Sequence, residues 1–292
     1  GKAEIVMKTS DGSIDGQGNL IGKPMADYRN EYGHILRGPE YISVFDGATG
    51  KVLATENYIP PRHPKKNNPS PKELKEVWGD GRGNRSERYL GGIAFLDGKH
   101  PSIIMSRGYY ERMAMCAWDW DGKQLKQRWF FDSEDGTEQS YKAHGQGNHS
   151  LSIADVDKDG ADEIIFGSVV INNDGTVLHS TGFGHGDASH LGDFDPNREG
   201  LEYFMVHEEA DNPNVPQIDY RDPKTGEVFW QVEGSGDIGR GVIADIDPNH
   251  LGAEMWASNG SGIHNLAGEV ISTTYPTTAG NGWSYNMFAW YD

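Results

Sequence analysis

The sequence predicts an all-β fold, on the basis of its composition, its turn signals and a repeated acidic motif. Among 292 residues, 39 are glycine and 11% are aromatic, which suits strands joined by tight turns better than packed helices. With 36% hydrophobic residues, the chain is long enough for one large domain or two ordinary ones. The formal net charge of −18 should repel nucleic acid and anionic membranes, so neither is expected as a partner.

The first repeated element is an acidic loop, seen in its fullest form as ADVDKDGADEI at 154–164. Each copy has acidic or Asn side chains at alternate positions, then a glycine, then a glutamate eight or nine places after the first aspartate. A short apolar run follows each glutamate and predicts a buried strand. A degenerate copy lies at 93–106, with Phe95 in the first acidic position. The three full copies comprise Asp155, Asp157, Asp159 and Glu163; Asp193, Asp195, Asn197 and Glu202; and Asp245, Asp247, Asn249 and Glu254.

The second repeated element is a hairpin, in which a polar, glycine-containing turn joins two apolar strands. The segments 41–59, 116–131 and 218–234 have this form, and their Asp-Gly and Thr-Gly turns are hairpin signals. Acidic loop, strand and hairpin recur every 38 to 60 residues. Four-stranded units at that period predict a β-propeller.

One insertion and the two ends depart from the repeat. The insertion at about 60–90 is rich in Pro, Lys and Asn, and includes a short predicted helix that Ser70 and Glu73 would cap. At the N-terminus Glu4 aligns with Glu163, but the preceding aspartates are absent, and the last ten residues resemble a strand. We therefore expect one partial propeller domain over 1–292, covering roughly five blades and cut at both ends.

Other features of the chain limit its class. The single cysteine, Cys116, excludes an intrachain disulfide and lies in an apolar run typical of a core. No stretch of the sequence is long and apolar enough for a membrane-spanning helix, and the first residues do not resemble a signal peptide.

The acidic loops predict calcium sites. Calcium takes six to eight oxygen ligands, and alternate carboxylates in a tight loop converge on one point. Within these loops no Cys or His stands at ligand spacing, which disfavours zinc and copper. Solvated acidic turns without an ion are the alternative, but three copies in register favour several bound Ca²⁺ ions.

Histidines gather between 144 and 190, where five of the eleven occur. His149 precedes one acidic loop by six residues, His185 precedes the next by eight, and Arg240 precedes the third by five. Equivalent positions on neighbouring blades should point at a common pocket, so we expect these three side chains to converge on a catalytic site. The alternative is that the histidines bind backbone groups in glycine-rich turns.

Long stretches of the sequence resemble the rhamnogalacturonan lyases of polysaccharide lyase family 11. The resemblance covers nearly all 292 residues and includes KAEIVMKTSDGSIDGQG, GPEYISVFDGATGKVL, WGDGRGNRSERYLGGIAFLDG, PSIIMSRGYYER, GQGNHSLSIADVDKDGADEIIFG, GHGDASHLGDFDP and GRGVIADIDP. It implies an eight-bladed, calcium-rich propeller that cleaves the rhamnosyl-α-1,4-galacturonate bond of the pectin polysaccharide rhamnogalacturonan I by β-elimination. It also implies an extracellular or periplasmic location, and we expect a monomer.

The implied chemistry needs a positive charge and a base. Bound calcium and Arg240 would neutralise the uronate carboxylate, and His149 or His185, neutral near pH 7, has suitable chemistry for proton removal. Arg240 would be a base only if its pKa were depressed. Asn148, Trp78 and Tyr109 are the predicted substrate-binding residues.

Two other functions compete with this one. A non-catalytic calcium-stabilised propeller that binds glycan or protein would have the same acidic loops, but it would not need the histidines and the arginine. A hydrolase with paired carboxylates is disfavoured, because carboxylates in metal loops are poor general acids.

Overall fold

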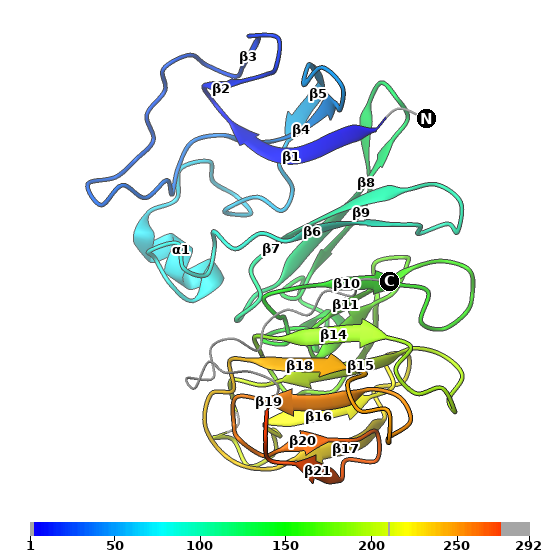
Figure 1. The fold of residues 1–292 in the computed structure, drawn as a ribbon. Coiled ribbons are helices and arrows are strands. Elements are labelled where there is room, and N and C mark those ends of the chain that lie inside the picture. The colour runs from blue at the N-terminus through cyan, green and yellow to red at the C-terminus, as the bar shows by residue number, and fades with distance from the viewer. Residues whose placement is uncertain (1–2, 210, 276–292) are drawn as a thin grey trace.

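The computed structural model describes residues 3–209 and 211–275, and within them the regular secondary structure is almost entirely β (Figure 1). Five antiparallel sheets follow one another along the sequence, and in each the strands pair in chain order. The first sheet contains β1 (Glu4–Ser10), β4 (Glu40–Asp46) and β5 (Val52–Asn57), and the short hairpin β2 (Ser13–Ile14) and β3 (Leu20–Ile21) precedes β4.

The other four sheets have four strands each. The second sheet contains β6 (Gly91–Ala94), β7 (Ser102–Arg107), β8 (Ala114–Trp120) and β9 (Leu125–Asp132). The third contains β10 (Ser152–Ala154), β11 (Glu163–Phe166), β12 (Val169–Ile171) and β13 (Val177–Ser180). The fourth contains β14 (Ser189–Gly192), β15 (Glu202–Val206), β16 (Ile218–Arg221) and β17 (Val228–Val232). The fifth contains β18 (Gly241–Ala244), β19 (Glu254–Ala257), β20 (Ile263–His264) and β21 (Val270–Ser272).

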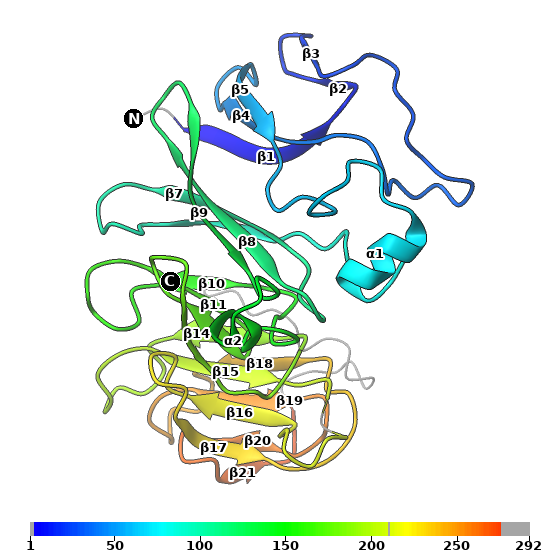
Figure 2. The same cartoon turned by 180° about the vertical axis from the view of Figure 1, so that it is seen from behind.

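The predicted all-β class and the predicted hairpins are confirmed. The segments 41–59, 116–131 and 218–234 form the antiparallel pairs β4–β5, β8–β9 and β16–β17. In both views the sheets lie one after another, from β1 at one end of the molecule to β21 at the other (Figures 1 and 2).

The core lies between successive sheets. Every residue of β11, β15 and β19, the second strands of the third, fourth and fifth sheets, is buried. One apolar cluster joins Ile104 and Met115 of the second sheet to Ile164 and Phe166 of the third. A similar cluster joins the fourth sheet to the fifth. The apolar runs after the acidic loops are therefore buried strands, as predicted.

Two short helices interrupt the sheets. The predicted helix is α1 (Pro71–Trp78), and Ser70 and Glu73 form the expected capping box at its start. The other helix, α2 (Glu138–Tyr141), was not predicted. Cys116 is buried in β8, as its apolar surroundings indicate. Neither helix in the described part of the chain has the length and hydropathy to cross a membrane.

Candidate active site and metal loops

The three acidic loops occupy the same place in three consecutive sheets, between the first strand and the second. The residue before the first aspartate pairs with the glutamate that ends the loop: Ala154 with Glu163, Gly192 with Glu202, and Ala244 with Glu254. The repeat found in the sequence is therefore a structural repeat, with each glutamate at the first position of its strand.

These three glutamates share an unusual environment, because all are fully buried. In each, Oε2 accepts backbone N–H groups of its own loop, from Val156, from Phe194 and Asp195, and from Ile246 and Asp247. The other oxygen, Oε1, has no hydrogen-bond partner among the described residues in any of the three. A buried carboxylate oxygen without a donor is costly, and a cation would satisfy it.

The loop at 155–163 has the most complete ligand set. Oxygens of Asp155, Asp157 and Glu163 lie within 4.8 Å of one another. The backbone N–H of Asp159 donates to the two other aspartates, at 3.1 Å each, which turns the loop inward. The φ of +93° at Gly160 allows this turn, since residues with a Cβ rarely adopt it. Burial, with the charges of the three aspartates, raises the pKa of Glu163 to about 7.

The degenerate loop lacks the key ligand. At the register where the other loops have a buried glutamate, Ser102 pairs with Ala94. The hydroxyl of Ser102 donates to Asp119 at 2.7 Å instead. The loop between β6 and β7 therefore lacks the buried glutamate that the other three loops share.

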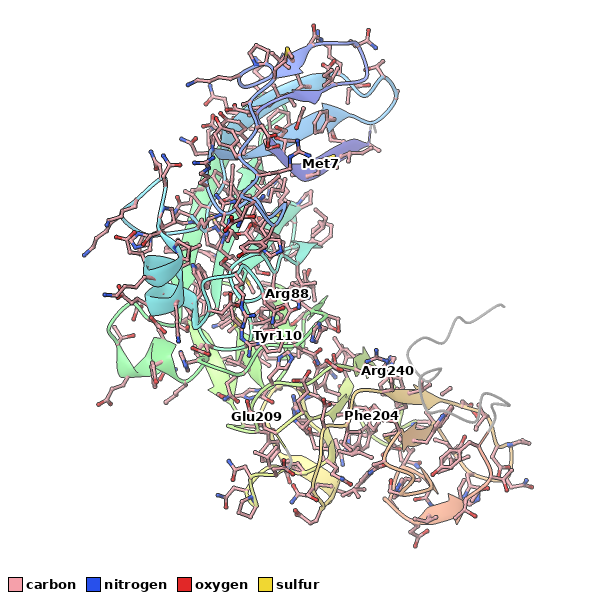
Figure 3. All side chains as sticks on the ribbon, turned by 90° about the vertical axis from the view of Figure 1, so that its left-hand side faces the viewer. Met7, Arg88, Tyr110, Phe204, Glu209 and Arg240 are labelled. Atoms are coloured by element: carbon pink, nitrogen blue, oxygen red, sulfur yellow. The ribbon has the colours of Figure 1, made fainter. Side chains whose placement is uncertain are left out.

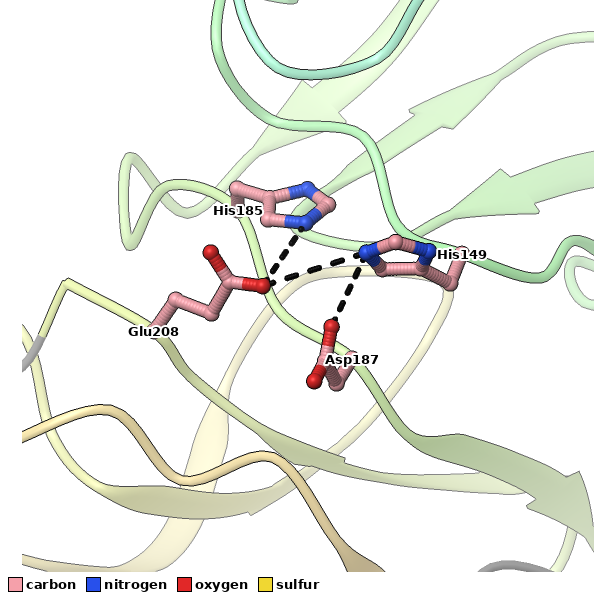
Figure 4. A group of neighbouring side chains, drawn as sticks. All are labelled: His149, His185, Asp187 and Glu208. Atoms are coloured by element: carbon pink, nitrogen blue, oxygen red, sulfur yellow. Dashed lines mark ion pairs between the residues drawn. The ribbon is translucent and has the colours of Figure 1, made fainter. Parts of the chain in front are cut away.

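A second group of possible ligands gathers outside the acidic loops. It contains His149, His185, Asp187 and Glu208, whose ligand atoms all lie within 4.8 Å of one another (Figure 4). His149 comes from the loop before β10, His185 and Asp187 from the loop before β14, and Glu208 from the segment after β15. A parallel backbone bridge between Asn148 and Gly186 joins the first two loops and brings the histidines together.

Glycine makes this junction possible. A Cβ on Gly186 would lie 2.0 Å from the carbonyl oxygen of Val206, and one on Gly147 would lie 2.4 Å from the Cβ of Tyr109. Neither distance is compatible with a side chain, so the glycine-rich motifs reflect close backbone packing at the site.

His185 has one ring nitrogen already occupied. Its Nδ1 lies 2.6 Å from the carbonyl oxygen of Gly147, and since a carbonyl only accepts, Nδ1 carries the hydrogen. In the neutral ring the lone pair is then on Nε2. This nitrogen is buried, has no hydrogen-bond partner in the described part of the chain, and lies 3.4 Å from Oε1 of Glu208. Metal-binding histidines are commonly oriented in this way by a backbone carbonyl.

His149 is held from several sides. Its Nε2 lies 2.9 Å from Asp187 Oδ1 and 3.8 Å from Glu208 Oε1, and the hydroxyls of Tyr109 and Tyr110 contact its two ring nitrogens at 3.0 and 3.1 Å. The hydrogen bonds to Asp187 and Glu208 raise the pKa of His149 to about 9. Without a bound cation, the ring is therefore protonated at neutral pH and is a poor general base.

The structure brings together the three predicted catalytic residues. Arg240 Nη1 donates to Asp187 Oδ2 at 3.1 Å, and Asp187 in turn binds His149. Asp187 and Glu208, which complete the cluster, were not predicted from the sequence. Asp187 stands two positions after His185, and Glu208 follows the buried strand β15. Their places as polar residues next to a predicted site residue and a predicted buried strand could have indicated them.

Other histidines of the same region fit the alternative interpretation. His179 Nε2 contacts the carbonyl oxygen of Pro223 at 2.7 Å, and His190 Nε2 contacts that of Gly241 at 3.1 Å. These two side chains bind backbone groups and lie outside the cluster.

All three predicted substrate-binding residues are buried. Trp78 is 2% exposed and its indole N–H donates to the carbonyl of Arg62, while Tyr109 is 4% exposed and its ring stacks on His185. Neither ring offers an exposed face to a sugar, so burial disfavours direct contact between these two rings and the substrate. Asn148 is fully buried, and its backbone bridge positions the two histidine loops.

Known proteins of similar sequence agree with the family resemblance described above. A family model described as "Rhamnogalacturonan lyase family 11, C-terminal domain" matches residues 1–292. The rhamnogalacturonan exolyase YesX and the rhamnogalacturonan endolyase YesW of Bacillus subtilis (strain 168) are both 48% identical to the chain over its whole length, and the chain covers 46% and 44% of them.

Solved structures agree with the sequence matches. The crystal structure of the exotype lyase YesX matches 93% of this chain and 44% of its own with a TM-score of 0.85 at 48% identity. The Bacillus licheniformis rhamnogalacturonan lyase PL11 matches 91% of this chain and 43% of its own with a TM-score of 0.83 at 49% identity. The chain spans less than half the length of these relatives, and it belongs to rhamnogalacturonan lyase family 11 in the part that the family model describes as the C-terminal domain.

Proposed function

We propose that this chain is a propeller domain of a calcium-dependent lyase that cleaves the rhamnosyl-α-1,4-galacturonate bond of rhamnogalacturonan I by β-elimination. Relatives named as rhamnogalacturonan exolyase and endolyase support the substrate class. Five sheets in chain order, four of them four-stranded, support the assignment of the sheets as propeller blades. A polysaccharide substrate in the plant cell wall favours an extracellular or periplasmic monomer.

The observation that carries the proposal is the cluster of His149, His185, Asp187 and Glu208. Two imidazoles and two carboxylates from three separate loops, with ligand atoms within 4.8 Å of one another, form a suitable shell for a divalent cation. The exposed fractions of the side chains of Asp187 and Glu208 are 18% and 26%, so the cluster is open to a substrate.

Calcium fits the acidic loops best. Their candidate ligand atoms are all oxygens, and the buried Oε1 atoms of Glu163, Glu202 and Glu254 have no hydrogen-bond partner among the described residues. We propose one structural Ca²⁺ in each loop. The mixed nitrogen and oxygen cluster at the histidines is less specific for calcium, because imidazole also suits transition metals.

The residues of the cluster have distinct parts in the proposed reaction. A divalent cation bound there supplies positive charge that neutralises the uronate carboxylate and makes its C5 proton more acidic. His185 presents Nε2 as a ligand, because its Nδ1–H is engaged by Gly147. Arg240 is anchored by Asp187, and its guanidinium, 25% exposed, adds a second positive group for the substrate carboxylate.

The test uses the whole protein that contains this domain. Rhamnogalacturonan I is the substrate, and the ultraviolet absorbance of the conjugated uronate product reports β-elimination. We expect His185→Ala to lower turnover about a hundredfold, the usual scale for an essential polar group at a reacting centre. His100→Ala, a change of an exposed histidine in the degenerate loop, is the control and should leave turnover unchanged.

The competing function is a non-catalytic propeller that binds glycan. It predicts polysaccharide binding with no unsaturated product, and that result with the wild-type protein would reject the lyase proposal. Full turnover in an excess of chelator would reject the metal-dependent part.

A further inference from the structure

The loop that follows α1 gathers arginines without acidic partners in a strongly acidic protein. Arg82, Arg85 and Arg88 line one cavity of about 970 Å³, between this loop and residues 33–36. No carboxylate of the described residues lies within ion-pair distance of any of the three, whereas Arg62, Arg107 and Arg112 of neighbouring segments all form ion pairs. With a net charge of −18, such a concentration of guanidinium groups that pair with no carboxylate of the described residues is unexpected.

The acidic residues of this cavity are occupied by the protein itself. Asp80 accepts the backbone N–H groups of Arg82, Gly83 and Arg85, at 2.6, 2.9 and 2.6 Å, which fixes the loop that bears the arginines. Glu87 binds Arg62 and Arg107 at 2.8 and 3.2 Å.

Glu111 is then the only carboxylate among the described lining residues without a cation or loop amides to bind. Asp80 keeps its charge, because backbone amides are neutral, whereas Glu87 is paired with Arg62 and Arg107. Three guanidinium groups therefore stand against the two carboxylates Asp80 and Glu111, and the lining retains a small positive excess.

Two of the arginines are oriented before any ligand binds. The guanidinium of Arg85 lies 3.8 Å from the ring centroid of Tyr110, a stacked cation–π arrangement that leaves the N–H edges of the fork free. Arg88 donates to the backbone and side chain of Asn84, and its guanidinium lies 5.8 Å from the same ring. An ordered guanidinium fork matches a carboxylate and loses little freedom when it binds one.

Tyr110 connects these arginines to the candidate active site. Its hydroxyl lies 3.1 Å from His149 Nε2, and its ring centroid lies 4.3 Å from that of His185. In Figure 3, Arg88 and Tyr110 lie next to each other. Arg240 lies farther along the molecule, directly before β18 of the fifth sheet. A polymer that crosses the cluster toward α1 would therefore meet Arg85 and Arg88.

We propose that Arg85 and Arg88 form a subsite for a second galacturonate carboxylate of the same polysaccharide chain, at least one sugar away from the bond that is cleaved, with Arg82 at its exposed end. This inference rests on the proposed function, because it takes an acidic polysaccharide as the ligand. Since the acidic surface repels such a polymer, a local set of cations is needed to hold it on either side of the reacting sugar.

The experiment measures binding separately from cleavage. Whole protein with Arg85→Gln or Arg88→Gln is titrated calorimetrically with acidic rhamnogalacturonan oligosaccharides and with the same oligosaccharides after reduction of their carboxyl groups to alcohols. Each variant should bind the acidic ligand about tenfold more weakly, the scale of one charged hydrogen bond, and the reduced ligand as well as wild type does. In turnover, KM should rise and kcat should stay the same.

Arg128→Gln is the matched control, because it removes the same charge from an exposed arginine of β9 that already pairs with Asp119. Three results would overturn the subsite. They are an equal loss of affinity for the acidic and the reduced ligand, a loss of affinity no larger than that of the control, and no binding by the wild-type protein. Arginine-dependent binding without any unsaturated product would support the subsite and reject the lyase proposal, so the two failures are distinct.

Discussion

Glu163 should have opposite effects on stability with and without calcium. Its carboxylate is buried, one oxygen has no partner among the described residues, and three aspartates surround it. These causes raise its pKa from 4.5 to about 7. At about 1.4 kcal/mol per unit, ionising this group costs the metal-free fold about 3 kcal/mol relative to the unfolded chain.

The sign of the pH dependence follows from the direction of the shift. Because the pKa is higher in the folded state, stability is greatest below the unfolded value of about 4.5 and is lost as pH rises to about 7. The metal-free protein should therefore lose about 3 kcal/mol of unfolding free energy over this window from this group. Calcium supplies the missing charge, so the dependence should disappear when the ion is bound.

Glu163→Gln provides the direct test, with urea unfolding at about pH 8 in chelator and in saturating calcium. In chelator the variant should be more stable than wild type by about 3 kcal/mol, since the amide still accepts the N–H of Val156 and carries no charge. In calcium it should be the less stable protein, because it lacks a ligand. Glu56→Gln, an exposed change on β5, should show no such reversal. If the wild-type protein in chelator is as stable as Glu163→Gln, or more stable, the reasoning is refuted.

Three further changes test other parts of the structure. In metal-free protein, Asp187→Asn should move the pKa of His149 from about 9 down toward its ordinary value, as NMR titration of the ring would show; an unchanged value would contradict the assigned hydrogen bond. Asp219→Asn should cost about 3–5 kcal/mol in urea unfolding, because it leaves the buried charge of Arg221 without its partner, and a loss below about 1 kcal/mol would contradict this. Phe204→Ala should cost about 3–5 kcal/mol in the same assay, since the ring is fully buried between the fourth and fifth sheets.

Local features of the sequence were sufficient for the all-β class and for most strands. Hairpin turns, apolar runs after each acidic loop, and the capping box of Ser70 and Glu73 depend on neighbours a few residues apart, and each appears where predicted. The acidic loops were also visible in the sequence, because their acidic and Asn residues stand within ten residues of one another.

The composition of the site was decided by contacts between distant segments. Repeat alignment predicted that His149, His185 and Arg240 would converge, but it did not single out Asp187 or Glu208. Asp187 stands six residues before its acidic loop, as His149 does, but it has a different side chain, and Glu208 lies after β15, outside the motifs that were compared. These carboxylates complete the cluster, because the bridge between Asn148 and Gly186 and the end of β15 place them there.

Burial likewise depended on the folded chain. Trp78 and Tyr109 were predicted to bind substrate, but Trp78, the last residue of α1, packs in a buried cluster with Leu36 and Ala114. The ring of Tyr109 is buried and stacks on that of His185. The sequence by itself determined the repeating strands and the acidic loops, since spacing along the backbone sets local geometry. Only the tertiary structure decided which charges meet and which rings stay exposed, because those depend on the packing of one sheet against the next.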